Sequence, residues 1–177
     1  TDDYEWEDLT TGAYCAYYND ESYVNTYGYL YNGFAVDSNK IALPGWRVPN
    51  DEDVHELITF LITTPPKVDF SEVQGTNAGG KLKDSGYDYW WDPNKGATNE
   101  YGFSALPGGY RYVDIYSKHS SFWEMSKIAS FWNLLHWYDP NKASVGYINL
   151  HFDRSDILRV ITGDKHIGRS VRLVKED

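Results

Sequence analysis

Cysteine is nearly absent from the chain, which holds only Cys15 in 177 residues. No intrachain disulfide can form, so the cysteine content indicates neither an oxidising nor a reducing compartment. A lone cysteine with no histidine or second cysteine close by is far more often a small buried residue than a nucleophile. A chain of this length buries enough apolar surface to fold without disulfides or metal. We expect a single domain over residues 1–177.

Long apolar runs are also missing. No stretch approaches the roughly 18 apolar residues that a membrane-spanning helix needs, and the first residues, Thr1 to Tyr4, do not resemble a secretion signal. We expect no membrane insertion by this segment. If the protein is exported, its signal was removed or lies outside this sequence.

Basic residues are scarce relative to acidic ones. Sixteen Lys and Arg stand against 26 Asp and Glu, which gives a formal net charge of −10. A surface that binds nucleic acid needs a basic patch, because it must neutralise phosphates. The charge balance therefore argues against nucleic acid as a partner, and it also disfavours anionic membranes.

The common catalytic motifs are incomplete. His55-Glu56 begins like a zinc-protease helix, but position 59 is Thr where a second His is needed. No Gly-Lys-Ser/Thr accompanies the glycines at 75, 79 and 80, and the five histidines show no ligand spacing. We expect no enzyme. Paired carboxylates for glycoside hydrolysis stay open as an alternative, because such pairs meet only in the folded chain.

Oxygen-bearing side chains cluster in one short stretch. Asp92, Asn94, Asn99 and Glu100 have the ligand atoms that calcium prefers. These residue types are more common as turn formers. We therefore expect turns at these positions, and neither a metal nor another cofactor in the protein.

Aromatic residues are abundant. The chain has 16 Tyr, 7 Trp and 7 Phe, or 17% of its residues. So many tyrosines cannot all be buried, and exposed tyrosines suit recognition because each ring offers a large rigid contact area and a hydroxyl. The alternative for any single tyrosine is an ordinary place on the face of a β-strand.

One helix is predicted by both its ends and its apolar spacing. Asn50 is a good N-cap, and the acidic residues 51–53 favour the positive end of the helix dipole. Val54, Leu57, Ile58, Leu61 and Ile62 form one apolar stripe. The segment Thr63-Thr64-Pro65-Pro66 ends the pattern. We expect a helix over residues 50–63.

The rest of the chain favours strands and loops. Alternating and β-branched patterns predict strands over residues 23–36, 110–116, 130–133, 143–152, 157–162 and 170–175. We expect an arm or first short strand over 1–22, and a helical turn over 81–83. Residues 87–109 are too rich in Gly, Pro, Asn and Asp for regular structure and too aromatic for disorder. One long helix, an ordered loop-rich middle and late antiparallel strands predict an α+β fold.

Six ordered segments carry a family resemblance. They are GWRVP (45–49), GGKLK (79–83), GATNE (96–100), GFSALPGGYR (102–111), FW (131–132) and GRSVRLVK (168–175). Together they resemble the Fibrobacter succinogenes major paralogous domain family, over nearly the whole chain. This resemblance implies a C-type-lectin-like fold, in the branch of formylglycine-generating enzymes and of the variable proteins of diversity-generating retroelements.

The same resemblance implies a location and a role. Family members are mostly exported or cell-surface proteins of Bacteroidetes and relatives, or parts of their phages, and no activity is generally assigned to them. We therefore expect an extracellular or surface protein for adhesion, or alternatively a receptor-binding part of a phage tail. The enzymes of the branch use a copper-binding cysteine pair, which a chain with one cysteine lacks.

Three positions depart from the family pattern. Leu43 and Leu173 stand where many members have cysteines, and Arg169 stands where an aromatic residue usually precedes Ser-Val-Arg. Leucine is a reasonable substitute for a buried cysteine, so we expect the fold to be kept.

By the resemblance, residues 130–170 are the candidate variable ligand-binding region. In diversified relatives, adenines of asparagine codons are randomised here, a process that cannot produce Lys, Gln, Glu, Met or Trp. None of these five occurs between Ala143 and Asp164. The predicted ligand-binding residues are Asn133, Leu134, His136, Tyr147, Asp153, Arg154, Ser155, Ile157, Val160, Thr162, Asp164 and His166.

The apolar members of this region are expected on a binding face. Ile157, Val160 and Ile167 are assigned to that face, and Trp137 and Tyr138 would add aromatic anchors. A mixed apolar and charged surface favours a protein ligand or a cell-surface receptor. The alternative is a carbohydrate-binding module, in which the aromatic segment from Tyr89 to Glu100 would stack on a glycan.

Overall fold

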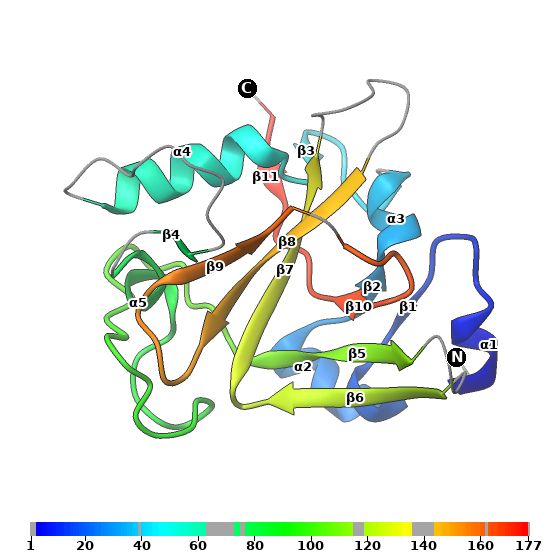
Figure 1. Ribbon diagram of the computed structural model, residues 1–177, viewed down its shortest axis with the longest axis horizontal. Helices are drawn as coiled ribbons and strands as arrows, with labels where there is room; N and C mark the ends of the chain where they lie inside the picture. Colours follow the sequence, from blue (N-terminus) through cyan, green and yellow to red (C-terminus); the bar gives the residue numbers. More distant parts are fainter. Residues whose placement is uncertain are drawn as a thin grey trace.

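The computed structural model describes residues 3–38, 40–62, 73–74, 77–114, 119–135, 144–161 and 163–176. These residues form a mixed α/β fold that consists mostly of strands with a few helices (Figure 1). The larger sheet has the strand order β1-β2-β10-β5-β7-β8-β9-β4, with β6 paired to β5, and β11 and β3 make a separate small sheet.

The elements follow one another in this order along the chain. They are α1 (Asp3–Glu7), β1 (Tyr14–Cys15), η1 (Tyr17–Asn19), η2 (Glu21–Tyr23), α2 (Val24–Tyr27), β2 (Leu30–Asn32), α3 (Gly33–Asp37), β3 (Trp46–Arg47), α4 (Asp51–Leu61), β4 (Val73–Gln74), α5 (Ala78–Leu82), β5 (Gly108–Asp114), β6 (His119–Met125), β7 (Ile128–Leu135), β8 (Ser144–His151), β9 (Ile157–Val160), β10 (Gly168–Arg169) and β11 (Val174–Lys175).

The helix α4 confirms the prediction made from its cap and stripe. Asn50 and Asp53 form a capping box, in which each side chain accepts a hydrogen bond from the backbone N–H of the other. Arg47 donates two hydrogen bonds to the Asp53 carboxylate, which ties β3 to the start of the helix. The buried residues Val54, Ile58 and Leu61 lie on one side of α4, as the spacing requires.

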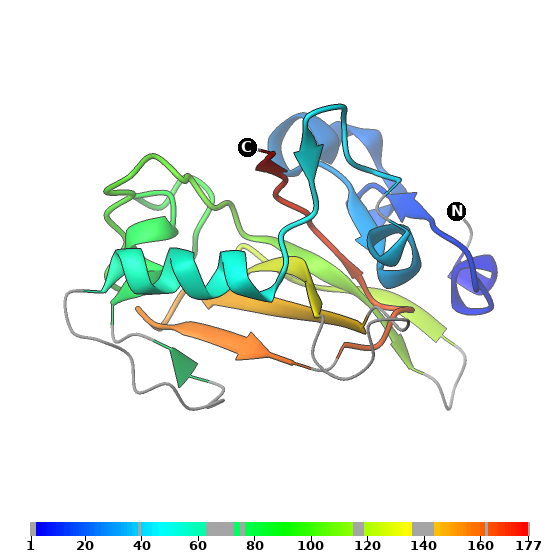
Figure 2. The same cartoon turned by 90° about the horizontal axis from the view of Figure 1, so that it is seen from above.

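The strands β7, β8 and β9 pair antiparallel and divide their side chains between two faces. Ala129 lies opposite Leu150 and Phe131 opposite Ile148, and these residues pack in one core cluster with the apolar stripe of α4 (Figure 2). We call this the helix face. The intervening pairs, such as Ser130 with Asn149, point the other way because successive side chains of a strand alternate. We call that the cleft face.

A buried cation holds the loop-rich middle of the chain against the sheet. Lys83 is fully buried, and its Nζ donates to the carbonyl oxygens of Lys95 (3.0 Å), His151 (2.8 Å) and Arg154 (2.9 Å). Its Nζ also lies 5.3 Å from the centre of the Trp90 ring. The Lys83 side chain therefore connects the loop that contains Lys95 with the end of β8 and the turn that follows it.

Two glycines allow this close approach. A Cβ on Gly79 would lie 2.1 Å from the carbonyl oxygen of Asp156, and one on Gly80 would lie 2.1 Å from that of Gly96. No other residue fits these contacts, because the opposing atoms are backbone. The Gly79-Gly80-Lys81-Leu82-Lys83 segment, which holds most of α5 and the residue after it, thus serves close packing against neighbouring backbone.

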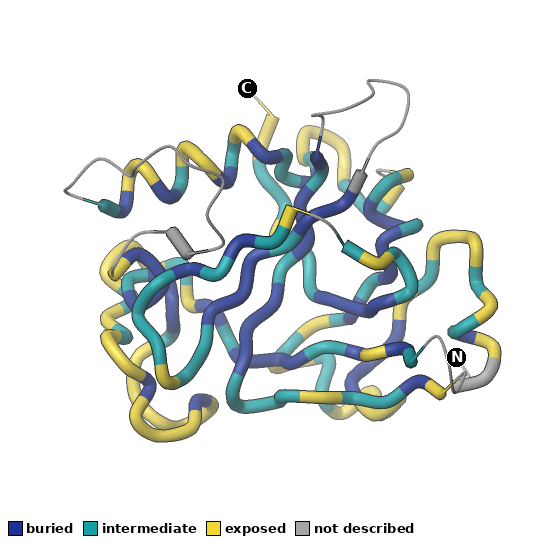
Figure 3. The backbone as a smooth tube through the Cα atoms, viewed as in Figure 1, coloured by how far each residue is buried: buried dark blue, intermediate teal, exposed yellow. Residues whose placement is uncertain are grey.

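Residues 87–107, which precede β5, form no helix or strand, as predicted (Figure 1), and this stretch mixes exposed with buried residues (Figure 3). Asn94 and Asn99 both adopt positive φ. The Asn94 amide donates to the carbonyl oxygens of Asp84 (3.0 Å) and Gly86 (2.8 Å), and Asn99 accepts from the Ser104 backbone N–H (2.7 Å). The expectation that they form turns is confirmed.

Several strand predictions need correction. The predicted strand over 23–36 is wrong apart from β2, because Gly28 at positive φ ends α2 and Asn32 caps α3. The hairpin strand β6 was not predicted. The late strands are not all antiparallel, since β5 meets β7 in parallel at Gly109 and Ala129. The predicted strand over 170–175 is present only as β11, with β10 just before it.

The N-terminal segment is part of the core. Trp6, Cys15, Tyr17, Leu30 and Val113 form one buried cluster. The indole N–H of Trp6 donates to the His166 carbonyl oxygen at 2.7 Å, which ties the start of the chain to the segment before β10. Cys15 is a buried core residue, as expected.

We predict that Lys83→Met lowers the free energy of unfolding by about 3 kcal/mol or more, because three buried carbonyls lose their donor and each costs about 1–3 kcal/mol. Urea denaturation followed by tryptophan fluorescence at pH 7 measures the change. The matched control is Lys95→Met, an exposed side chain, which should change stability by no more than about 0.5 kcal/mol. Equal losses in the two variants would contradict the role assigned to Lys83.

Candidate functional site

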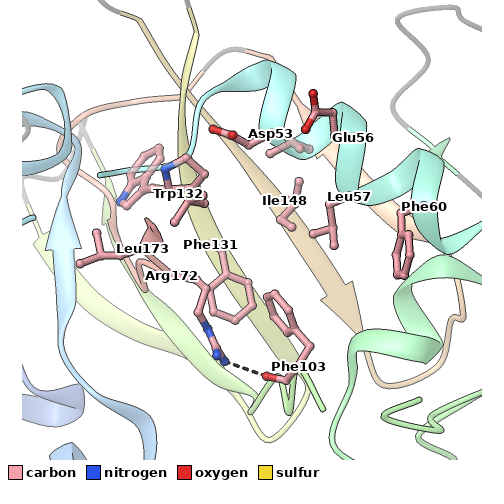
Figure 4. A pocket seen from close by; sticks show the side chains of 13 residues that line it. Asp53, Glu56, Leu57, Phe60, Phe103, Phe131, Trp132, Ile148, Arg172 and Leu173 are labelled. Atoms are coloured by element: carbon pink, nitrogen blue, oxygen red, sulfur yellow. Dashed lines mark hydrogen bonds between the residues drawn. The ribbon is translucent and has the colours of Figure 1, made fainter. Parts of the chain in front are cut away.

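Two cavities open on opposite faces of the sheet. The first, which we call the helix groove, has a volume of about 550 Å³ and lies between α4, the sheet and the C-terminal segment (Figure 4). Most of its wall is apolar, with Leu57, Phe60, Phe103, Phe131 and Ile148 among the lining residues. None of the ligand-binding residues predicted from the sequence lines it.

The charged side chains of the helix groove are mostly engaged within the protein. Asp53 accepts both hydrogen bonds from Arg47. Arg172 lies over the Phe103 ring, 4.5 Å from its centre, and donates to the Phe103 carbonyl oxygen at 2.9 Å (Figure 4). The groove therefore offers apolar surface but few free polar groups to orient a ligand.

The second cavity, the sheet cleft, has a volume of about 490 Å³ on the cleft face. It exists because β5 and β7 pair only at Gly109 and Ala129 and then diverge (Figure 1). Its lining residues are Tyr110, Tyr112 and Val113 of β5, Ile128 of β7, Tyr147, Asn149 and His151 of β8, and Asp164, Ile167 and Arg169.

The floor of the sheet cleft holds a buried guanidinium. Arg169 is 6% exposed, and its Cζ lies 3.5 Å from the centre of the Tyr147 ring, 5.1 Å from Tyr110 and 5.3 Å from Trp132. Nη1 donates to Ser130 Oγ. Burial lowers the pKa of Arg169 to about 10, while the phenols of Tyr147 and Tyr110 act in the opposite direction.

Three polar atoms in the sheet cleft have no hydrogen-bond partner among the described residues. They are Asn149 Oδ1, His151 Nε2 and Arg169 Nε, each with almost no exposed surface. Asn149 is 8% exposed, and burial lowers the pKa of His151. Buried polar atoms are nearly always satisfied, so three unsatisfied atoms on residues that line one cavity point to a surface suited to a polar ligand.

Four predicted site residues lie at or beside the sheet cleft. Tyr147 and Asp164 line it. Val160 lies opposite Tyr147 in the β8–β9 ladder and so shares the cleft face. His166 contacts Asp164, whose Oδ1 lies 2.9 Å from both the backbone N and Nδ1 of His166.

Three residues assigned to the exposed binding face are buried instead. Ile157 is 0% exposed in the core under α4, and Asn133 is buried on the same helix face. Ile157 and Val160 cannot share a face, because they are three positions apart on one strand. Ile167 is buried in the cluster around Trp132, although one side of it lines the sheet cleft. The prediction that these three residues lie on an exposed ligand-binding face is therefore wrong.

The remaining predicted residues lie elsewhere or outside the described residues. Asp153, Arg154 and Ser155 belong to the turn between β8 and β9, which packs against Gly80 through the Ser155 carbonyl oxygen (2.9 Å). Leu134 is half-buried against the cluster of Trp132. His136, Thr162, Trp137 and Tyr138 lie outside the described residues.

Sequence reasoning missed several residues of the sheet cleft. Tyr110, Tyr112 and Arg169 come from strands that the sequence does not mark as neighbours. Asn149 and His151 could have been found, because they follow Tyr147 at the period of two that keeps side chains on one strand face.

A comparison with family models identifies the chain. The model described as the Fibrobacter succinogenes major domain matches residues 1–175. The chain belongs to this family. No curated protein and no solved structure matches it significantly.

The three positions at which this Fibrobacter succinogenes major domain departs from the family pattern now have a structural context. Arg169 stands where the resemblance places an aromatic residue, and three rings surround its guanidinium. Leu173 is half-buried in the cluster of Trp132, but Leu43 is exposed. Leu43 is therefore not the buried replacement for a cysteine that we expected.

Within the described part of this domain, no helix combines the length and apolar character that a bilayer crossing requires. Among those same residues, no group of three or more His, Cys, Asp or Glu side chains is arranged as a metal site.

We predict that His151 makes the protein less stable in acid. Burial holds its pKa below the ordinary 6.5, so the unfolded chain takes up a proton at a higher pH than the folded one. The stabilisation is present above pH 6.5 and is lost as the pH falls toward the folded-state pKa. His151→Gln should therefore lose less stability than the wild type between pH 7 and pH 5 in urea denaturation. Parallel pH profiles of the two proteins would contradict this prediction.

Proposed function

We propose that this chain is a non-enzymatic ligand-binding domain with a C-type-lectin-like fold, which recognises a protein or cell-surface receptor through the sheet cleft and its rim. The observation that carries the proposal is the convergence of Asn149, His151 and Arg169, each with an unpartnered polar atom, in a cavity walled by tyrosines. An extracellular or cell-surface location goes with the proposal and is supported by the family resemblance alone.

The rim of the sheet cleft has the composition of a protein-binding surface. Tyr112 is exposed there, and Ile161 is exposed directly after β9. Leu158 and Val160 are half-buried on the cleft face of β9. Aromatic and aliphatic anchors around a few polar groups are typical of protein interfaces. The exposed side chains of Tyr112 and Ile161 can change with little effect on the core, because neither residue is among those that form the three buried clusters.

A carbohydrate-binding module is the second candidate, on a different surface. Trp91 is 55% exposed, and Tyr87, Tyr89 and Tyr101 are exposed on the same ordered loop region. The Lys127 ammonium lies 4.5 Å from the centre of the Trp91 ring and holds it in place. Exposed rings held in fixed positions suit stacking on a sugar.

Two single substitutions separate the candidates. We predict that Tyr112→Ala weakens binding of the cell-surface ligand about tenfold or more, the effect expected of an aromatic anchor, and that Trp91→Ala leaves it unchanged. The measurement is titration of labelled protein onto intact target cells. A photo-cross-linker at position 112 should form an adduct that one at position 87 does not.

A glycan array with and without calcium tests the alternative. Glycan binding that Trp91→Ala abolishes and Tyr112→Ala leaves intact would overturn the first proposal in favour of the carbohydrate module. Cell binding that survives both substitutions would contradict both. Circular dichroism of each variant confirms that its fold is retained, as expected for exposed residues.

A further inference from the structure

Two arginines of the sheet are buried to a similar extent but differ in their partners. Arg159, on the helix face, forms an ion pair with Asp51 at the start of α4. Arg169, on the cleft face, has no carboxylate partner among the described residues, and only ring faces and the Ser130 hydroxyl contact its guanidinium. A buried cation without an anion is costly, and cation–π contacts offset only part of that cost.

The acids nearest the sheet cleft do not supply this anion. Asp164 lines the cleft, but its Oδ1 accepts from the backbone N–H of His166 and contacts its ring. Glu124 of β6 forms an ion pair with Lys127 at 3.7 Å, and Asp156 forms one with Arg154 at 2.8 Å. The positive charge on the floor of the cleft is therefore uncompensated within the described part of the chain.

The atoms without hydrogen-bond partners define the chemical group that would neutralise the Arg169 charge. Arg169 Nε presents one N–H donor, and Asn149 Oδ1 presents an acceptor. The two lie close together, because Asn149 is the cross-strand partner of Ser130 and Ser130 binds the Arg169 guanidinium. An anionic oxygen for Arg169, with a hydrogen-bond donor beside it for Asn149, satisfies both.

We propose that the sheet cleft binds a carboxylate group with a hydroxyl or amide N–H beside it, and that Arg169 is the residue that binds the anion. This inference rests on the proposed function of the same cleft and names the chemistry of its ligand. An acidic sugar and an acidic peptide both carry such a group. The rings of Tyr110 and Tyr147 would flank either one.

Four small probes test the chemistry and distinguish its sources. Glucuronate stands for the acidic sugar and N-acetylglycine for the peptide, and glucuronamide and N-acetylglycinamide are their neutral counterparts. Titration into ¹⁵N-labelled protein, followed through the amide signals of Asn149, His151 and Arg169, gives the affinity of each. We expect at least one acid to bind about tenfold or more tightly than its amide, the ratio expected of a charge-assisted hydrogen bond.

The variants assign this preference to Arg169. Arg169→Met should remove the preference for the acid, whereas Arg172→Met, which alters the helix groove, should keep it. Asn149→Asp is a second variant in case Arg169→Met does not fold. This variant places a carboxylate beside the Arg169 guanidinium, where it would repel the carboxylate of the ligand. It should therefore also remove the preference for the acid over its amide.

The inference and the proposed function fail in different ways. Equal binding of each acid and its amide, or no shift of the cleft signals with any probe, would overturn the inference. If Tyr112→Ala still weakens cell binding in that case, the proposed function stands without it. A preference for acids that persists in both Arg169→Met and Asn149→Asp would also overturn the role of Arg169.

Discussion

The pairing of β7 with β8 is the constraint on which the rest of the molecule depends. Eight consecutive residue pairs, from Ile128 with His151 to Leu135 with Ser144, fix which side chains point to α4 and which to the sheet cleft. A shift of one position would exchange the two sets and bury the polar side of the sheet under the helix. The core cluster on the helix face makes such a shift unfavourable, so the cleft face can carry polar groups that do not stabilise the fold.

The two faces deal with buried charge in different ways. On the helix face, Arg159 and Asp51 neutralise each other, and the pair joins β9 to the first residue of α4. On the cleft face, Arg169 remains a cation among rings. The same residue type thus has a carboxylate partner on one side of the sheet and none among the described residues on the other. The difference arises from the carboxylate that α4 supplies, not from the strands themselves.

Local signals account for what the sequence predicted correctly. The helix α4 has a cap, an apolar stripe and a dense acidic first turn, all within a dozen residues, and Asn94 and Asn99 form turns through their own side chains. The family resemblance also rested on segments with local roles, such as Gly79 and Gly80, whose missing side chains permit contact with a neighbouring backbone.

Errors arose where the outcome depends on distant partners. Ile157 was placed on a binding face, although the strand period puts it on the side that α4 covers. The sheet cleft is lined by residues of β5, β8 and β10, which are far apart in the sequence. Its position depends on the single parallel contact between β5 and β7 at Gly109, which no local pattern predicts. The tyrosines of the 23–36 segment suggested a strand, but Gly28 and Asn32 break the backbone pattern there.

The buried ammonium of Lys83 takes a place in the structure that a bound metal ion could otherwise fill. This ammonium binds three carbonyl oxygens, one from the loop around Lys95, one from the end of β8 and one from the turn after β8, an arrangement that loop-rich proteins often achieve with a bound metal ion. A cation that is covalently part of the chain cannot be diluted away or removed by a chelator. These three contacts of Lys83 therefore need no ion from the medium.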